Sequence, residues 1–314
     1  MATSTVQPEK ILKELAGLWG TMSKGESQGV NSGVLRACAM TLVVATESEA
    51  DAIAAGETLA ELMHDHPSRA IVLRPIAEQG KLDARVFAQC WMPFGKRQQI
   101  CCEQIEITAS VDRVNEVYST ILGIMAPDLP VVLWIRGGSW LECEGFVNLL
   151  KLAQKVIVDS SQGGSLAMIQ RLQPQVKLLG DLAWTRLTSF REVIAHTLED
   201  HRILGDLPRV RQIVVEYSSH PVSAAYLGGW LQTASPDAQV EIRVKAGAHD
   251  SVRLTGEGVD IFVEFGPTVF FRINGYDHRA VLPVPSEVNV MREELSVLEL
   301  DQVFRAALER AEKL

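Results

Sequence analysis

The spacing of apolar and polar residues predicts a chain in which strands and helices alternate. Apolar residues recur at helical spacing over 8–20, and the segments that follow switch between apolar runs and helical repeats. In the first half, this pattern predicts strands at 35–45, 69–75, 83–91, 100–109, 129–136 and 155–160. It predicts helices from about 46 to 63, from about 112 to 125, after Ser139, and from 165 to 172. Short connections between such elements are typical of a parallel or mixed sheet covered by helices.

Three of these strands, 69–75, 83–91 and 100–109, follow one another without a helical pattern between them. We therefore expect them to be antiparallel neighbours. Helix starts are indicated by capping boxes, in which a serine or threonine precedes a glutamate by three positions. These pairs are Thr46 with Glu49, Ser139 with Glu142, Ser189 with Glu192, and Ser296 with Glu299.

The second half repeats the strand, helix, strand order and then changes to short strands. Residues 182–201 are predicted to form a helix in two pieces. A βαβ-like unit is predicted from a strand at 211–217, a helix at 221–232 and a strand at 239–244. Four short strands follow, and Asn274-Gly275 between two of them is typical of a hairpin turn. An amphipathic helix at 293–313 is expected to end the pattern.

Residues 173–181 interrupt the pattern and are the predicted domain boundary. Residues 20–33 are rich in glycine and serine without an apolar run, which is typical of a flexible linker. The sequence therefore predicts an N-terminal helix with its linker at 1–34, a Rossmann-like α/β domain at 35–176, and a second α/β domain at 177–314. Each domain is expected to hold a mixed or partly parallel sheet with covering helices, and the second to end in an antiparallel meander and a C-terminal helix.

Composition and charge narrow the range of partners. The 314-residue chain is 47% apolar and 22% charged, which are ordinary values for a globular protein. Its formal net charge is −9, whereas proteins that bind nucleic acid or anionic membranes normally carry a basic surplus. The longest apolar stretches are far shorter than the ~20 residues of a spanning helix. We therefore expect no nucleic acid and no membrane as partner, and, because no secretory leader is visible, a cytoplasmic location.

The cysteines are odd in number and show no metal-like spacing. They are Cys38, Cys90, Cys101, Cys102 and Cys143. Such usage suits a reducing compartment, so we expect all five to be buried thiols. The sequence assigns no role to the adjacent pair Cys101 and Cys102.

Motifs that carry catalysis or cofactor binding are not found in the sequence. There is no P-loop, no Gly-x-Gly-x-x-Gly after a strand, no His-Glu-x-x-His and no EF-hand loop. Ser165, within Gly163–Ala167, resembles a nucleophile elbow, but an elbow serine directly follows its strand and Ser165 lies six residues beyond Asp159. His64 and His66 could be two metal ligands, yet no third ligand stands at metal spacing. We expect no catalytic residue, no metal and no cofactor, and keep a serine hydrolase acting through Ser165 as the least favoured alternative.

Polar residues that follow two predicted parallel strands form a possible anion site. Arg136, Gly137, Gly138 and Ser139 follow one strand, and Asp159, Ser160 and Ser161 follow the next. Ligands of open α/β sheets collect at the carboxyl ends of strands, where helix N–H groups can bind anions. Glycine and serine also serve as ordinary helix caps in such loops. A sensor of a phosphorylated small molecule is therefore an alternative function.

Aromatic and arginine residues crowd one short stretch of the second half, where Trp184, Arg186, Phe190 and Arg191 stand close together. Tryptophan and arginine dominate the energetics of many protein interfaces, although most tryptophans are core residues. We name Trp184, Arg186 and Arg191 as candidate contacts with a protein partner, with Arg69 and Arg136 as less favoured ones.

Five collinear segments resemble a known family. They are HPSRAIVL (66–73), CCEQIEI (101–107), DLPVVLWIRG (128–137), VIVDS (156–160) and DLAWTRLTSFREVIA (181–195). In this order they are similar to the glucose-6-phosphate dehydrogenase assembly proteins of bacteria, the OpcA family. The resemblance implies a non-catalytic allosteric activator that binds glucose-6-phosphate dehydrogenase, favours its active oligomer and supports the oxidative pentose phosphate pathway. A small-molecule effector is compatible with this role.

Overall fold

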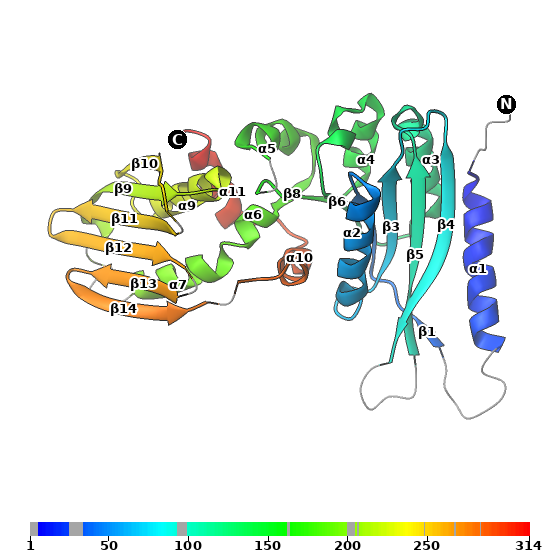
Figure 1. Ribbon diagram of the computed structural model, residues 1–314, viewed down its shortest axis with the longest axis horizontal. Coiled ribbons are helices and arrows are strands. Elements are labelled where there is room, and N and C mark those ends of the chain that lie inside the picture. The colour runs from blue at the N-terminus through cyan, green and yellow to red at the C-terminus, as the bar shows by residue number, and fades with distance from the viewer. Residues whose placement is uncertain are drawn as a thin grey trace. The chain divides into compact units, whose positions relative to one another are not determined.

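The computed structural model describes residues 6–24, 34–92, 99–161, 164–199, 205, 207–247, 249–266, 268–282 and 284–314. Contacts within the chain divide it into two compact units, unit 1 (1–159 and 170–180) and unit 2 (160–169 and 181–314). Each unit contains its own sheet, drawn in Figure 1. Most of the predicted linker, residues 25–33, lies outside the described residues.

Unit 1 is built around sheet A, which is mostly parallel. Its strands are β1 (Val34–Arg36), β2 (Met40–Ala45), β3 (Ser68–Pro75), β4 (Leu82–Trp91), β5 (Gln99–Ala109), β6 (Val131–Ile135), β7 (Lys155–Val158) and β8 (Leu178–Asp181). The order is β1-β5-β3-β2-β6-β7-β8, with β4 paired to β5. Strands β2, β6 and β7 are buried at every residue, which explains their continuous apolar runs. The predicted mixed α/β fold class is confirmed.

The helices of the first 180 residues correspond to most of the predicted ones. They are α1 (Pro8–Lys24), α2 (Glu49–Leu62), α3 (Val114–Ile124), α4 (Val147–Leu152) and α5 (Leu166–Leu172), with 3-10 turns at Val111–Arg113, Ser139–Glu142, Glu144–Phe146 and Gln173–Gln175. Helix α1 packs on β4 and α3, and α2 packs on β3 (Figure 1). The predicted strand at 35–45 is two strands, because residues 37–39 separate β1 from β2.

The pairing of β3, β4 and β5 differs from the expectation of antiparallel neighbours. Strands β4 and β5 are antiparallel as predicted, but β3 and β5 are parallel, with Arg69 opposite Glu103 and Pro75 opposite Ala109. Strand β5 lies between β3 and β4 in the sheet. The chain therefore skips one strand position between β3 and β4, and β5 then fills that position. Apolar patterning marks where strands occur but does not specify which neighbour each one takes.

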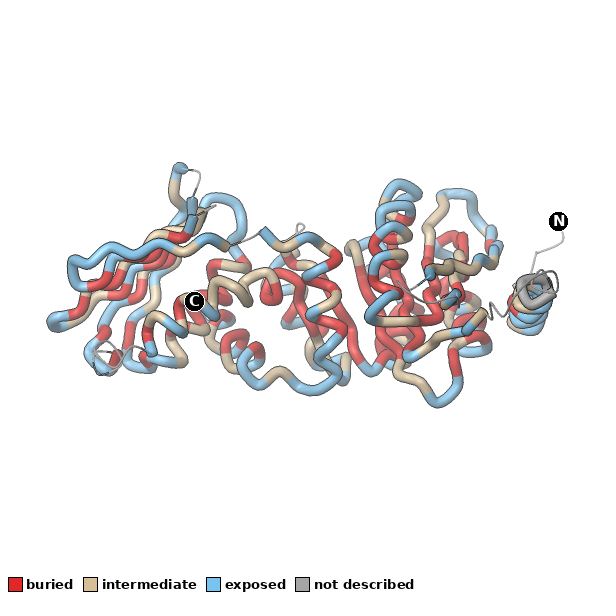
Figure 2. The backbone as a smooth tube through the Cα atoms, turned by 90° about the horizontal axis from the view of Figure 1, so that it is seen from below, coloured by how far each residue is buried: buried red, intermediate tan, exposed pale blue. Residues whose placement is uncertain are grey.

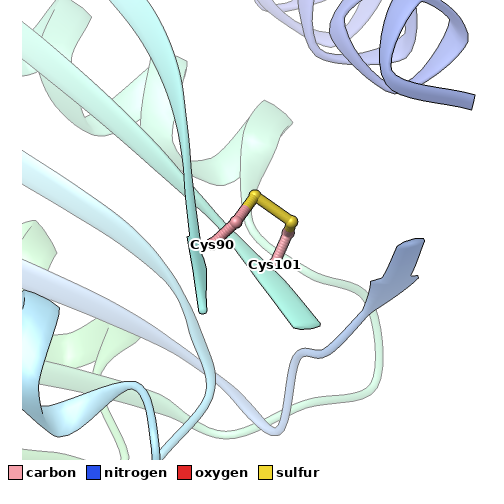
Figure 3. The surroundings of a disulfide bond; sticks show 2 residues. All are labelled: Cys90 and Cys101. Carbon is pink, nitrogen blue, oxygen red and sulfur yellow. A yellow bond between two sulfur atoms is a disulfide. The ribbon is translucent and has the colours of Figure 1, made fainter. Parts of the chain in front are cut away.

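A disulfide joins Cys90 on β4 to Cys101 on β5, directly opposite each other in the register (Figure 3). This corrects the expectation that all five cysteines are thiols. Cys38, Cys102 and Cys143 are free, and burial raises the pKa of the Cys102 thiol to about 11. Two cysteines eleven positions apart become opposite only once the antiparallel register is set, which the sequence alone does not give.

Unit 2 is built around sheet B, whose order is β10-β9-β11-β12-β13-β14. The strands are β9 (Val210–Tyr217), β10 (Gln239–Val244), β11 (Asp250–Gly256), β12 (Val259–Phe265), β13 (Thr268–Ile273) and β14 (Tyr276–Val281). The predicted βαβ unit is confirmed, because β9 and β10 are parallel and joined by α9 (Pro221–Ala234). The later strands are antiparallel. Buried residues alternate with more exposed ones along β12 and β13 and in part of β11, whereas β14 has no buried residue; Figure 2 shows this colouring along the strands.

The core of unit 2 lies on one face of sheet B. Helix α9 supplies Ala224 and Leu227, and α7 (Thr188–Leu198) supplies Ile194 and Leu198. These side chains pack on the inward residues of the strands, among them Ile261. Helix α6 (Leu182–Thr185) precedes α7, so the prediction of a helix in two pieces is confirmed. A 3-10 turn at Leu207–Arg209 leads into β9.

Helix starts differ from the four predicted capping boxes. Ser48, not Thr46, caps α2 by accepting the backbone N–H of Asp51, while the Thr46 hydroxyl donates to the Leu73 carbonyl at 2.7 Å. Neither α7 nor the turn at Ser139–Glu142 has a side-chain cap. The predicted helix at 293–313 is two helices, α10 (Glu287–Ser296) and α11 (Gln302–Ala311). Asp301 starts α11 by accepting two backbone N–H groups, which separates it from α10.

No helix in the described part of the chain combines the length and the apolar character that crossing a membrane requires.

Candidate functional site

The carboxyl ends of β2 and β6 mark the point where the strand order of sheet A reverses. From β2 the chain continues to β3 on one side, whereas β6 lies on the other side. Open α/β sheets bind ligands in the crevice at such a reversal. The predicted anion-binding residues Arg136 to Ser139 lie in the loop after β6, so they stand where a ligand of this fold class would bind.

The chain's own carboxylates fill this loop. The Ser139 backbone N–H donates to Glu47 Oε1 at 3.2 Å. A Cβ atom on Gly137 would lie 1.8 Å from the carboxyl carbon of Glu47, so a larger residue here would move the Glu47 side chain. Arg136 donates from Nε to Asp51 Oδ1 at 2.6 Å. The groups expected to bind a phosphate therefore bind Glu47 and Asp51 instead.

The start of α2 is acidic. Glu49 and Asp51 stand in its first turn, and Glu47 directly precedes the cap residue Ser48. A helix start at the reversal of strand order is where the pyrophosphate of a dinucleotide binds in related folds. Asp51 is paired with Arg136 and Glu49 with Arg74, whereas the Glu47 carboxylate occupies the Ser139 N–H and opposes a phosphate group there by like-charge repulsion. The residues of this crevice therefore disfavour a nucleotide, in agreement with the missing glycine-rich turn.

The second group of predicted anion-binding residues is also engaged. Asp159 belongs to unit 1, whereas Ser160 and Ser161 belong to unit 2. The Ser160 backbone N–H donates to Asp181 Oδ1 at 3.0 Å, and Ser161 Oγ accepts from Arg186 Nη1 at 2.9 Å. Arg186, a predicted partner contact, thus makes a contact inside its own unit.

Asp181 is a completely buried carboxylate that accepts three hydrogen bonds. The donors are the backbone N–H groups of Ser160 and Ala183 and the hydroxyl of Tyr226, the latter two at 2.9 and 2.8 Å. Burial raises the pKa of Asp181, and this effect exceeds that of the hydrogen bonds, which lower it. The folded state keeps the proton of the Asp181 carboxyl group to a higher pH than the unfolded chain does. The stability that Asp181 contributes is therefore present below the ordinary aspartate pKa and is lost as the pH rises through the raised pKa of the folded state.

We expect Asp181→Asn to change the free energy of unfolding by less than about 1 kcal/mol, because the amide keeps an acceptor and cannot ionise. Asp181→Ala leaves buried donors unpaired and should cost about 3 kcal/mol. Urea unfolding at several pH values measures both effects. In the asparagine variant, the free energy of unfolding should also lose the pH dependence above about pH 4 that Asp181 causes. Equal losses in the two variants would contradict this account.

Trp184 lies inside unit 2, with 3% of its surface exposed. Its Nε1 donates to Asp301 Oδ2 at 3.1 Å, and the Arg191 guanidinium lies 3.6 Å from the centre of its ring. Burial lowers the pKa of Arg191 to about 10. Trp184 therefore offers no surface to a partner and is removed from the candidate contacts, and Arg191 serves internal packing. The sequence pattern of tryptophan with arginine identified a real cluster but not its burial.

Arg69 is also internal, with 5% of its surface exposed. Its Nε donates to Glu103 Oε2 at 2.6 Å, and its Nη1 donates to the carbonyl oxygen of Ile124. Glu103 additionally accepts from Arg36 Nη2 and from Trp19 Nε1, each at 2.8 Å. This buried ionic cluster connects α1, β1, β3 and β5, so Arg69 is also removed from the candidate contacts.

The weaker chemical candidates have structural roles. Ser165 Oγ accepts the Met168 backbone N–H at 3.3 Å, as expected of a residue that caps the start of α5, and Gly163 lies outside the described residues. The His64 ring contacts Trp91 edge to face at 5.0 Å. Within the described residues, no three histidine, cysteine, aspartate or glutamate side chains are grouped so that they could hold a metal ion.

The face of sheet B opposite its core carries a mixed set of side chains that we call the open face. It consists of Val214, Glu216, Glu241, Arg243, Lys245, Arg253, Asp260, Phe262, Glu264, Phe270, Arg272, Asp277 and Arg279. All of these residues are intermediate or exposed, and the helices α7 and α9 pack on the other face.

Two phenylalanines of neighbouring strands, Phe262 on β12 and Phe270 on β13, form the aromatic part of the open face. The rings of Phe262 and Phe270 are 6.5 Å apart, and the guanidinium groups of Arg272 and Arg279 lie 5.3 and 5.9 Å from the Phe270 ring centre. Arg272 also pairs with Asp277 at 2.8 Å, and this hydrogen-bonded pair lowers the pKa of Asp277. Aromatic rings with arginines at the centre and ion pairs around them are typical of a protein-binding surface.

Further ion pairs lie on strands β9 to β12 of the open face. They join Arg253 to Asp260 at 2.9 Å, Arg243 to Glu241 at 2.5 Å, and Lys245 to Glu216 at 3.3 Å. Sequence reasoning missed this surface. The sequence signal for this surface was the alternation of apolar residues with charged residues in strands β11 to β14. Phe262 and Phe270 stand at positions where a charged residue is expected and interrupt that alternation.

The architecture defines an α/β protein with two compact units, each built around its own sheet. An oxidoreductase from Sinorhizobium meliloti is similar with a TM-score of 0.50 at 12% identity, covering 90% of this chain and 96% of that one. The likeness concerns the fold alone. The chain belongs to the OpcA family: residues 59–174 match the model described as glucose-6-phosphate dehydrogenase subunit N-terminal domain, and residues 177–308 match the C-terminal domain. The predicted family resemblance is confirmed.

Curated relatives carry the name OxPP cycle protein OpcA. The one from Synechocystis sp. (strain PCC 6803) is 28% identical over 195 residues, which are 59% of this chain and 40% of the relative. The one from Nostoc punctiforme is 26% identical over 203 residues, which are 62% of this chain and 43% of the relative. The matched region thus spans about two fifths of the length of these relatives.

Proposed function

We propose that this protein is a non-catalytic assembly factor that binds glucose-6-phosphate dehydrogenase and favours its active oligomer. It would thereby support the entry step of the oxidative pentose phosphate pathway. The observation that carries the proposal is the match of both units to models named for that dehydrogenase. The acidic α2 start, where a nucleotide-dependent enzyme of this fold needs a phosphate site, supports a role without catalysis.

The open face is the proposed contact with the dehydrogenase. It has aromatic and arginine side chains of the kind that dominate interface energetics, and ion pairs lie beside them on the same face. Of the contacts proposed from sequence, Arg136 is engaged with Asp51, and Arg186 and Arg191 are engaged within unit 2. The open face therefore takes their place as the proposed site.

The proposed mechanism is a population shift. A protein that binds the active dehydrogenase assembly more tightly than the inactive form moves the equilibrium by the difference between the two binding free energies, typically about 1–3 kcal/mol. No side chain of this protein has to enter the dehydrogenase active site.

The two alternative functions have weaker support. Glu47 and Asp51 bind the groups that a phosphorylated small molecule would use in unit 1, and Ser165 is bonded as a helix cap. A metabolite effector would therefore have to displace Glu47 from Ser139.

Co-purification with the dehydrogenase of the same organism tests the proposal. The two purified chains should elute together in size-exclusion chromatography with light scattering. The complex should contain a larger fraction of the active dehydrogenase oligomer and show a higher rate at low substrate. Absence of a complex together with unchanged kinetics would refute the proposal and leave the fold and the family unaffected.

A further inference from the structure

Strand β14 is an exposed edge of sheet B. It pairs with β13, and among the described strands no other one lies beside it. All of its residues except Ala280 are exposed, and Tyr276 and Val281 expose 74% and 80% of their surface. An edge strand with exposed apolar side chains presents unpaired backbone groups to which another strand can add.

The hairpin geometry identifies which backbone groups are unpaired. Asn274 and Gly275 have φ values of 47° and 90°, so they form the two-residue turn in which the flanking residues, Ile273 and Tyr276, exchange both hydrogen bonds. Such bonded pairs alternate along an antiparallel ladder. The N–H and C=O groups of Asp277, Arg279 and Val281 therefore point away from β13.

We propose that two copies of this chain associate through antiparallel pairing of their β14 strands. The two sheets would then be one continuous sheet with a two-fold axis at His278. This proposal is independent of the dehydrogenase and of the function proposed above. The occupant is a second copy because β14 is complementary to itself in charge and in side-chain size.

The charges select one register. Hydrogen bonding requires that the unpaired N–H and C=O groups of one β14 strand face those of the second β14 strand. Two antiparallel registers in which five residues overlap meet this requirement. In one of them Arg279 lies opposite Arg279 of the second copy, which is repulsive. In the other Asp277 lies opposite Arg279 of the second copy, and the symmetry forms this pair twice. The row Arg272, Asp277 on the open face then continues with an arginine of the second copy.

The same register pairs large side chains with small ones. On the inner face of sheet B, Tyr276 lies opposite Ala280 of the second copy, so that the exposed ring covers a methyl group. On the outer face, Val281 lies opposite Gly275 of the second copy. Both strongly exposed apolar residues of β14 therefore gain a neighbour without a clash.

Charge reversal on β14 tests the pairing. Asp277→Arg and Arg279→Asp each create like charges across the axis and should weaken self-association at least tenfold. Mixed in equal amounts, the two variants place two arginines opposite two aspartates and should associate again. Loss of fold in either variant cannot produce this rescue, and circular dichroism of each variant alone verifies the fold.

Sedimentation velocity gives the readout, at about 100 µM chain because small interfaces associate weakly. The unchanged protein should approach twice the 34.5 kDa chain mass. Arg279→Pro should be monomeric yet folded, because it removes an N–H group that β13 does not use. Glu241→Arg, on the opposite edge strand β10, is the matched control and should leave the dimer intact. The proposal would be overturned if the unchanged protein stays at the monomer mass or if both charge-reversal variants remain dimers. It would also be overturned if the equal mixture of the two variants does not associate.

Discussion

Replacement of Phe270 by glutamate should lower the affinity for glucose-6-phosphate dehydrogenase by about thirtyfold or more. Phe270 lies on β13 in the open face, where its ring is next to Phe262 and to the guanidinium groups of Arg272 and Arg279. Removing a central aromatic anchor typically costs 2 kcal/mol or more, which is about thirtyfold in Kd. Surface plasmon resonance with the immobilised dehydrogenase measures the affinity, and the rate enhancement at a fixed concentration of this protein should fall in parallel.

Phe87→Glu provides the matched control. Phe87 is an aromatic side chain on β4 of unit 1 that is 42% exposed, and it does not belong to the open face. This change adds the same charge and should leave the affinity within about twofold. If Phe270→Glu binds as well as the unchanged protein, or if Phe87→Glu loses binding equally, the open face is not the contact. Thermal unfolding of both variants should show that each remains folded.

The second large effect is expected in stability. Glu103→Gln should lower the free energy of unfolding by about 3 kcal/mol or more, because it leaves Arg69 as a buried charge without its carboxylate. The buried ionic cluster also loses the charge that Arg36 and Trp19 contact. Urea unfolding of the full chain, followed by the fluorescence of Trp19 and the other tryptophans, should show an earlier transition for unit 1.

Glu78→Gln is the corresponding surface control. The side chain of Glu78 is 69% exposed and pairs with Lys81 at 3.2 Å. Because exposed ion pairs contribute little, we expect a change below about 0.5 kcal/mol. Similar unfolding midpoints for Glu103→Gln and Glu78→Gln would mean that burial of the pair has no energetic consequence and would contradict this account.

Much of the fold could be predicted from apolar patterning. The continuous apolar runs of β2, β6 and β7 reflect burial on both faces, and the alternation in β11 to β13 reflects one buried face. Pairing could not be predicted in the same way. The parallel alignment of Arg69 with Glu103 and the opposition of Cys90 and Cys101 depend on where β5 inserts, which is decided by contacts between distant segments.

Local capping signals were less informative than they appeared. Thr46 and Glu49 fit a capping box, but the Thr46 hydroxyl satisfies the Leu73 carbonyl, and Ser48 performs the capping. The predicted single helix at the end failed for a similar reason, because Asp301 forms a new helix start. Short side chains that can bond several backbone groups choose among them only in the folded chain.

The candidate site was harder to predict than the fold. Trp184 and Arg191 have the composition of an interface, yet they stack on each other inside unit 2. Conversely, Phe262 and Phe270 were not among the candidate contacts, yet they lie on the open face. Composition identifies side chains suited to strong contacts, whereas only the fold decides whether those contacts are internal.

The ion pairs of the open face determine how salt should act on any partner that docks there. The surface has five basic residues, Arg243, Lys245, Arg253, Arg272 and Arg279, and five acidic ones, Glu216, Glu241, Asp260, Glu264 and Asp277, so its charges cancel although the whole chain carries −9. Long-range attraction or repulsion would therefore arise mainly from the remaining surface. Recognition at close range would depend on the order of positive and negative side chains along this surface. Ionic strength should therefore change the association rate less than it changes the orientation that the partner adopts.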